Sequence, residues 1–307
     1  MYAVKKNRLF RKEFPLYVLM FPGLAYLLIN NYIPMAGLFI AFKNIDYSKG
    51  IFGSDWAGFK NFAFLFKTSD AFVITRNTLL YNIAFIVLGT TMGVIVGIML
   101  SEMTKKVLTK TYQTALLLPQ LISYVIVAYI GYAFLSPDAG FLNKTILPIL
   151  GLQPVSWYMT SSCWPFILVF INIWKGLGYS SIIFLAAILG IDKSLYEAAV
   201  VDGASKWKQI KHITLPLLKP TITILVLMMV GRIFYSDFSL FYQVPMNSGA
   251  IYDTTNTIDT YVYRGLMQLN DVGMSAAAGC YQSVVGFIVV ILANMLVRKV
   301  DNENALF

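Results

Sequence analysis

The sequence predicts an all-helical membrane protein with six transmembrane helices. Apolar residues make up 58% of its 307 residues and charged residues only 13%, whereas a soluble domain carries roughly 25% charged residues. Six apolar stretches are long enough to cross a hydrocarbon core of roughly 30 Å. They are residues 14–42, 78–100, 114–135, 164–189, 217–238 and 278–297. The composition excludes a disordered chain, a coiled coil, a disulfide scaffold and an ordinary cytosolic enzyme.

Basic residues set the expected orientation of the six spans. The chain has 24 Lys and Arg residues against 15 Asp and Glu, and basic residues accumulate in cytoplasmic loops. Most of them fall before the first span, after the sixth, or in the second and fourth connections. Both termini are therefore expected in the cytoplasm. The chain then divides into an N-terminal arm (1–13), a transmembrane domain (14–300) and a C-terminal tail (301–307).

A row of glycines in the second span and two cysteines near predicted helix ends leave alternatives open. Gly89, Gly93 and Gly97 form a doubled GxxxG row, which lets two helices approach closely in lipid. The row indicates either a contact with another subunit or ordinary packing within the chain. Cys163 and Cys280 have no CxxC spacing. Buried free thiols are expected, with a disulfide as the alternative.

Between the fourth and fifth spans, residues 190–217 are too polar to cross a membrane and too regular for a plain loop. Asp192 or Ser194 is suited to cap a helix start. Gly203 is suited to end that helix, because glycine adopts the left-handed conformation of a C-terminal cap. Ser205 is a second candidate cap. The sequence therefore predicts two short helices joined by a glycine hinge, with the fifth span beginning at Pro216.

The spacing of this insert resembles the EAA loop of ABC-importer permeases. Glu197-Ala198-Ala199 is followed after three residues by Gly203, and after nine more by Ile213, one residue and Leu215-Pro216. The alternative is an amphipathic linker lying on the membrane. The resemblance implies that these positions couple the permease to its ATPase: Glu197, Ala198, Ala199, Asp202, Gly203, Ile213, Leu215 and Pro216.

Other segments are similar to the carbohydrate branch of these permeases. They are Trp56–Phe62, Asn77-Thr78, and the Asp192–Ala204 version of the loop. Many sugar permeases have a Gly-Gly-Pro turn after the fifth span, whereas this chain has residues 244–249 and then 258–264 in another form. That form resembles a subgroup frequent in Gram-positive bacteria and associated with oligosaccharides from complex polysaccharides.

The resemblance implies a type I ABC-importer permease fold, with the permease domain at 14–300 and cytoplasmic EAA coupling helices at 190–217, in a bacterial cell membrane. It implies four kinds of partner: a second permease subunit forming a heterodimer, two ATPase subunits, an extracytoplasmic substrate-binding (lipo)protein, and a sugar. ATP-Mg would sit on the ATPase subunits, with no cofactor on this chain. Oligosaccharides are the expected cargo; a monosaccharide, a polyol or a secondary carrier mechanism are the alternatives.

Two cations at membrane depth indicate a polar cavity. Lys175 and Arg232 each cost roughly 2.5–3.5 kcal/mol at a helix centre, so both are expected to face the bundle interior. The expected cavity residues are Asn172, Lys175, Gly176, Tyr179, Arg232, Tyr235 and Ser236. Such a face suits an acidic or heavily hydroxylated glycan. Alternatively, Arg232 pairs with Asp237 or the partner permease, and Lys175 fixes helix packing.

Missing motifs argue against other functions. The sequence has no GxxxxGK[ST] phosphate-binding loop, and its one histidine, His212, lies among lysines of the polar insert. It contains no nucleophile–His–acid set and no carboxylate deep in a span, which argues against an enzyme and an ion-coupled carrier. Its basic residues are dispersed, so nucleic-acid binding is not expected.

Overall fold

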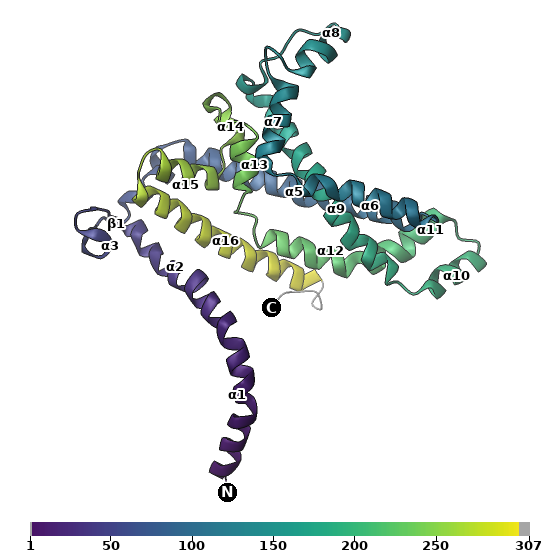
Figure 1. Cartoon of the computed structure of the whole chain (residues 1–307), viewed down its shortest axis with the longest axis horizontal. Helices are drawn as coiled ribbons and strands as arrows, with labels where there is room; N and C mark the ends of the chain where they lie inside the picture. Colours follow the sequence, from purple (N-terminus) through teal and green to yellow (C-terminus); the bar gives the residue numbers. More distant parts are fainter. Residues whose placement is uncertain (1, 301–307) are drawn as a thin grey trace.

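The computed structural model describes residues 2–300, so the predicted C-terminal tail, residues 301–307, lies outside the described residues. The long helices α5 (Asp70–Ser101), α9 (Trp164–Leu189), α12 (Leu215–Val230) and α16 (Val272–Val300) form a bundle that extends along the long axis of the molecule (Figure 1). α1 (Tyr2–Leu27) projects to one side of this bundle, and α7 (Tyr124–Leu135) with α8 (Leu147–Ile149) to the other (Figure 1).

Shorter elements form the two ends of the bundle. The hairpin end consists of α10 (Lys193–Val201) and α11 (Lys206–Gln209), next to the start of α6 (Lys106–Leu121). The loop end, opposite, carries α3 (Gly50–Gly53), α4 (Phe64–Lys67), α13 (Phe238–Gln243), α14 (Tyr252–Thr255), α15 (Ile258–Met267) and the antiparallel strands β1 (Lys43–Asn44) and β2 (Asp55–Trp56). The remaining elements are α2 (Ile33–Met35), 3-10 turns at Ala36–Phe42, Lys60–Phe62, Trp157–Met159, Ser161–Cys163 and Gly249–Ile251, and π-helical turns at Leu28–Tyr32, Leu142–Ile146 and Ile210–Thr214.

Five helical stretches of the described chain are long and apolar enough to cross a membrane. They are Glu13–Phe42, Asp70–Ser101, Ser161–Leu189, Lys206–Val230 and Val272–Lys299. A sixth is present if the bent pair α6 and α7 is one span. Each predicted span overlaps one of these stretches, and the predicted range 164–189 coincides with α9.

Each π-helical turn ends two residues before a proline. The turns at Leu28–Tyr32, Leu142–Ile146 and Ile210–Thr214 precede Pro34, Pro148 and Pro216. Proline lacks the amide that would bond the carbonyl four residues back, and its ring crowds that carbonyl. A wider turn before the proline shifts the hydrogen-bond register and lets the helix continue. These prolines therefore do not end their helices.

The predicted third span, 114–135, is not one straight helix. α6 ends at Leu121, α7 begins at Tyr124, and their axes differ by 93°. Ile122 is extended, with ψ of 129°, and the Ser123 hydroxyl caps α7 by accepting a hydrogen bond from the Ile126 amide at 3.4 Å. The apolar composition of the two segments conceals the break, because a cap inside an apolar run leaves the mean hydropathy almost unchanged.

The predicted fifth span, 217–238, is displaced towards the hairpin. Helix is continuous from Lys206 to Val230, so α11 is the first turn of this span and not a separate short helix. Beyond Val230 the chain leaves the helix, and residues 231–237 form a non-helical linker to α13. Pro216 lies inside the span, because the preceding π-helical turn accommodates it.

Two of the three glycines in the row, Gly93 and Gly97, pack against α9 within the chain. A Cβ on Gly93 or Gly97 would come within 2.9 Å of α9 side-chain atoms, at Ser180 and Phe184 respectively, whereas one on Gly89 would meet nothing within 4 Å. On α9, a Cβ on Gly178 would lie 2.2 Å from an α6 carbonyl oxygen. Small residues therefore set close approaches of α9 to both α5 and α6.

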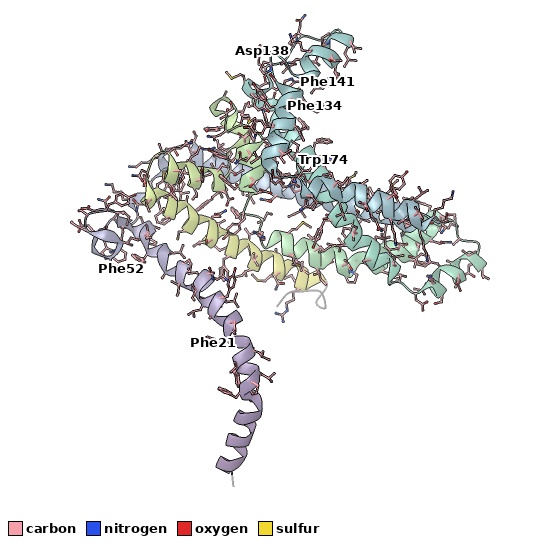
Figure 2. The ribbon with its side chains drawn as sticks, viewed as in Figure 1. Phe21, Phe52, Phe134, Asp138, Phe141 and Trp174 are labelled. Atoms are coloured by element: carbon pink, nitrogen blue, oxygen red, sulfur yellow. The ribbon has the colours of Figure 1, made fainter. Side chains whose placement is uncertain are left out.

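The two cysteines and the first span are only partly covered by the chain itself. Cys163 and Cys280 are free thiols. The prediction of free thiols is confirmed, but both side chains are half-buried rather than buried. Most of the first span, including Phe21 (Figure 2), is exposed in the isolated chain, as expected for a helix that meets lipid or another chain.

Candidate functional site

The ends of α10 are set by a side-chain cap and a glycine turn. Of the two predicted caps, Asp192 acts: its carboxylate accepts a hydrogen bond from the Ser194 amide at 2.9 Å. This bond holds the pKa of Asp192 below its usual value. At the other end, Gly203 has φ of +74°, and the Ala204 amide donates to the Ala199 carbonyl at 2.8 Å. The predicted glycine hinge is therefore a left-handed helix termination.

Three side-chain contacts fix this hairpin against the bundle. The Tyr196 hydroxyl lies 2.9 Å from the Thr214 hydroxyl, joining α10 to the π-helical turn. Gln209, which is buried, donates to the backbone of the inter-helix turn at 3.0 Å. Lys206 forms a 2.8 Å ion pair with Glu102, at the end of α5. The second predicted cap, Ser205, stands at the start of α11 but makes no side-chain cap bond.

The coupling residues predicted from the EAA spacing all lie on this hairpin or at its junction with α12. Glu197, Ala198, Asp202, Gly203, Leu215 and Pro216 are exposed, whereas Ala199 and Ile213 are half-buried. Apolar side chains are exposed beside them: Val201 is 86% exposed and Trp207 70%. The hairpin thus presents a mixed acidic and apolar surface on a helix whose start and end are both capped.

A cavity of about 500 Å³ lies between α5, α9 and α12. Its wall includes five of the predicted cavity residues: Asn172, Gly176, Tyr179, Arg232 and Tyr235. Aliphatic and aromatic side chains of the three helices make up much of the remainder. The cavity therefore combines aromatic faces with amide, hydroxyl and guanidinium groups, a combination suited to a polar ligand with C–H faces.

The other two predicted cavity residues, Lys175 and Ser236, are not among those lining this cavity. Lys175 is 5% exposed and donates to the Pro119 carbonyl at 2.9 Å and to the Ile122 carbonyl. Its ammonium also lies 4.7 Å from the Tyr124 ring centroid. Both carbonyls lie at the break between α6 and α7, where the Pro119 carbonyl also accepts a hydrogen bond from the Ile122 amide at 3.3 Å, so the position of Lys175 matches the packing alternative.

The linker 231–237 is held by side chains that the sequence reading missed. Asn82 of α5 donates to the carbonyls of Ile233 and Tyr235 at 2.9 and 3.1 Å. Gln282 of α16 donates to the Phe234 carbonyl at 2.6 Å. Non-helical backbone at membrane depth needs such partners. The available signal was an amide side chain inside each of two apolar spans.

Ser236 belongs to the same support. Its amide and hydroxyl both donate to the Asp259 carboxylate of α15, at 2.6 and 2.7 Å. Asp237 caps α13 by accepting hydrogen bonds from the Ser239 and Leu240 amides at 3.0 and 3.2 Å. Among the described residues it forms no ion pair with Arg232, so that predicted alternative is absent from this structure.

A buried arginine organises the loop end. Arg264 is 9% exposed, donates to the Asn247 side chain at 2.8 Å and to the Asn256 side chain, and lies 4.1 Å from the Tyr252 ring centroid. Burial lowers the pKa of Arg264. Asn247 adopts φ of +48°. These contacts fold residues 244–264 into a compact layer over the bundle.

A capped polar hairpin between two spans, together with a cavity of mixed polar and apolar lining between three helices, is typical of a multi-pass transport protein. The chain matches the family described as "Binding-protein-dependent transport system inner membrane component" over residues 89–302 and belongs to that family. It is an inner-membrane permease subunit of an ABC importer, a transport subunit and not an enzyme, for which no cofactor is expected.

Relatives and a solved structure agree with this assignment. The chain is 34% identical over 288 residues to "Protein LplB" of Bacillus subtilis (strain 168), covering 94% of this chain and 90% of that protein. It is 32% identical to the "Polygalacturonan/rhamnogalacturonan transport system permease protein YteP" of the same strain, covering 94% and 89%. A solved chain from a bacterial ABC transporter involved in the import of the acidic polysaccharide alginate is 33% identical. It superposes with a TM-score of 0.87, covering 97% of this chain and 99% of that one. The predicted all-helical permease fold is confirmed, with five candidate spans and a sixth if the bent pair α6 and α7 is one span.

Proposed function

We propose that this protein carries oligosaccharides into a bacterial cell as one half of a heterodimeric permease. The observation that carries this proposal is the cavity between α5, α9 and α12, where Tyr179 and Tyr235 stand beside Asn172 and Arg232. Aromatic faces pack against sugar C–H surfaces, while amide and guanidinium groups bond hydroxyls. The named relative YteP is a permease for polygalacturonan and rhamnogalacturonan, which supports the same cargo class.

The hairpin end faces the cytoplasm in this proposal, and both termini lie on that side. An ATPase subunit binds the exposed surface around Glu197, Val201 and Trp207. Because helix is continuous from Lys206 to Val230, a displacement of the hairpin moves this whole helix as a rigid body, including the part of it that lines the cavity. Closure of the ATPase pair on ATP-Mg thereby switches the cavity from inward-open to outward-open.

The remaining partners are a second permease, two ATPase subunits and an extracytoplasmic substrate-binding protein. The family description names binding-protein-dependent transport. A solved structure of the alginate transporter includes an alginate-bound periplasmic protein, and its matching chain is 33% identical to this one with a TM-score of 0.85. The loop end, ordered around Arg264, is the surface offered to such a protein.

The decisive experiment is purification of the chain with its genetic neighbours, followed by uptake in proteoliposomes. We expect a complex with a second permease and two ATPase subunits, and ATP-dependent uptake of oligosaccharides presented by the binding protein. A chain that purifies alone and transports without an ATPase would contradict the proposal. Uptake restricted to monosaccharides or polyols would replace the cargo class while leaving the mechanism intact.

Alanine variants test the cavity. Asn172→Ala and Tyr179→Ala remove a polar contact and an aromatic face from its wall. Each is expected to weaken the interaction with the substrate by about 1–2 kcal/mol and so to lower uptake roughly five- to thirtyfold, while the complex still assembles. Phe170→Ala, on the same helix but outside the cavity wall and 67% exposed, is the matched control. Unchanged uptake in both cavity variants would contradict the assignment.

A further inference from the structure

The two cations placed at membrane depth by the sequence have different environments. The Lys175 ammonium is buried against two backbone carbonyls and a tyrosine ring. The Arg232 side chain is exposed in the cavity wall, and it forms no ion pair and no hydrogen bond with any side chain or backbone group that the structure describes. Lys175 is therefore occupied by the fold, whereas Arg232 keeps its full set of donors available for a ligand.

The backbone that carries Arg232 is rigid although it is not helical. Asn82, Gln282 and Asp259, from three different helices, bond the residues that follow it. The Arg232 amide itself donates to the Met229 carbonyl at 3.0 Å. A guanidinium on a fixed backbone loses little further freedom when it binds, which favours selective recognition.

The cavity contains no acidic residue to neutralise this charge. None of the eighteen residues that line it is Asp or Glu. The nearest acids in the sequence have other duties: Asp237 caps α13 and Asp259 binds Ser236. A fixed positive charge facing a partly apolar space attracts an anion more strongly than it would in water.

We propose that Arg232 binds a carboxylate of the sugar, so that the preferred cargo is an oligosaccharide containing uronic acid residues. This inference rests on the proposed oligosaccharide function and adds that the transported oligosaccharide is negatively charged. A guanidinium matches a carboxylate with two parallel N–H···O bonds. Tyr179 and Tyr235, which share the cavity wall, face the sugar rings while Arg232 holds their acid group.

The test compares two probes with the same sugar chain, tri-galacturonate and its fully methyl-esterified form, in which each carboxylate is replaced by a neutral methyl ester. Uptake of each is measured in proteoliposomes containing the complete importer and a single preparation of binding protein, so the preference of that protein cancels between variants. Arg232→Gln is expected to lower tri-galacturonate uptake about tenfold or more while changing uptake of the ester by less than about twofold. Arg232→Lys keeps the charge without the planar fork and is expected to fall between the two.

Lys106→Gln removes one positive charge from an exposed position at the start of α6 and is the matched control, with both probes unaffected. Equal losses for the two probes in Arg232→Gln would show that Arg232 pairs with the partner permease or supports the fold, and would overturn the inference. So would unchanged uptake, or a wild type that imports only the ester; in these cases the oligosaccharide function stands. A wild type that imports neither probe overturns the inference about charge; only failure to import neutral oligosaccharides as well refutes the oligosaccharide function.

Discussion

The two ends of the fifth span differ in how the chain enters and leaves the helix. At the hairpin end, the π-helical turn Ile210–Thr214 absorbs Pro216, and helix continues without interruption from Lys206. At the loop end, helix stops at Val230, and amide and carboxylate side chains from other helices hold the linker 231–237. One end is continuous with its helix, and the other is anchored to its neighbours.

One span can serve two purposes because its two ends are held in different ways. A continuous helix transmits displacement, because its backbone bonds are all internal. A linker held by three other helices resists displacement relative to them, so its side chains keep a fixed geometry. The hairpin end is suited to receive force and the loop end to hold a ligand.

The largest effect is expected from reversing the charge of Glu197, which is exposed on α10. Glu197→Arg places a cation where the ATPase contact expects an anion, an interface change that costs at least about 30-fold in function. Uptake is expected to be abolished while membrane insertion is retained. The measurement is uptake at matched expression, with Lys193→Glu, also exposed on α10, as control. Near-normal uptake by Glu197→Arg would remove the hairpin from the mechanism.

At the anchored end, Asn82→Ala removes the amide that donates to the Ile233 and Tyr235 carbonyls. Leaving such carbonyls unpaired costs about 1–3 kcal/mol, so thermal unfolding in detergent is expected at a lower temperature. Asn30→Ala is the control, because the Asn30 amide bonds only the Tyr26 carbonyl of its own exposed helix, at 3.0 Å. Equal stability of the two variants would show that the linker needs no anchor.

At the continuous end, Gly203→Ala tests the hinge. A Cβ there would meet nothing within 4 Å, so the cost comes only from the left-handed backbone, about 1–2 kcal/mol. Uptake is expected to fall several-fold as the angle between α10 and α11 changes. Gly203→Asn is the matched comparison and is expected to lose less uptake than Gly203→Ala, since Asn tolerates the left-handed conformation better than Ala does. If both variants behave like wild type, the hinge angle does not matter for coupling.

The smallest effect concerns the cap of α10. The pKa of Asp192 is lowered by its bond to the Ser194 amide, so this capping contribution is present at neutral pH and is lost as pH falls through the lowered pKa. Hydrogen exchange of the α10 amides is expected to accelerate in acid. Asp192→Asn, which caps without a charge, is expected to remove this pH dependence. Persistence of the dependence in that variant would assign it to another group.

Much of the fold was predictable because it depends on local sequence. Span number follows from apolar run length, and the cap at Asp192 and turn at Gly203 follow from side-chain chemistry within a few residues. The break at Ile122 was missed because its stabilising cation, Lys175, lies on another helix, more than fifty residues along the chain. Five cavity residues were identified from helical spacing and charge. Asn82 and Gln282 were missed because their partners are backbone carbonyls elsewhere in the chain.

The sequence alone determined that the chain is a helical membrane protein with a polar hairpin, because apolar run length and residue spacing are local properties, and the spacing in that hairpin resembles the EAA loop of permeases. Lys175 and Arg232 have similar free-energy costs of insertion into a membrane. The tertiary structure decided which of them is hydrogen-bonded by the protein and which one faces the cavity. In the sequence, Lys175 and Arg232 are both cations within an apolar run. Their environments differ because Lys175 lies beside the end of α6 and bonds carbonyls there, whereas Arg232 lies on the linker 231–237 and faces the cavity. That distinction depends on contacts between distant segments, which only the folded chain creates.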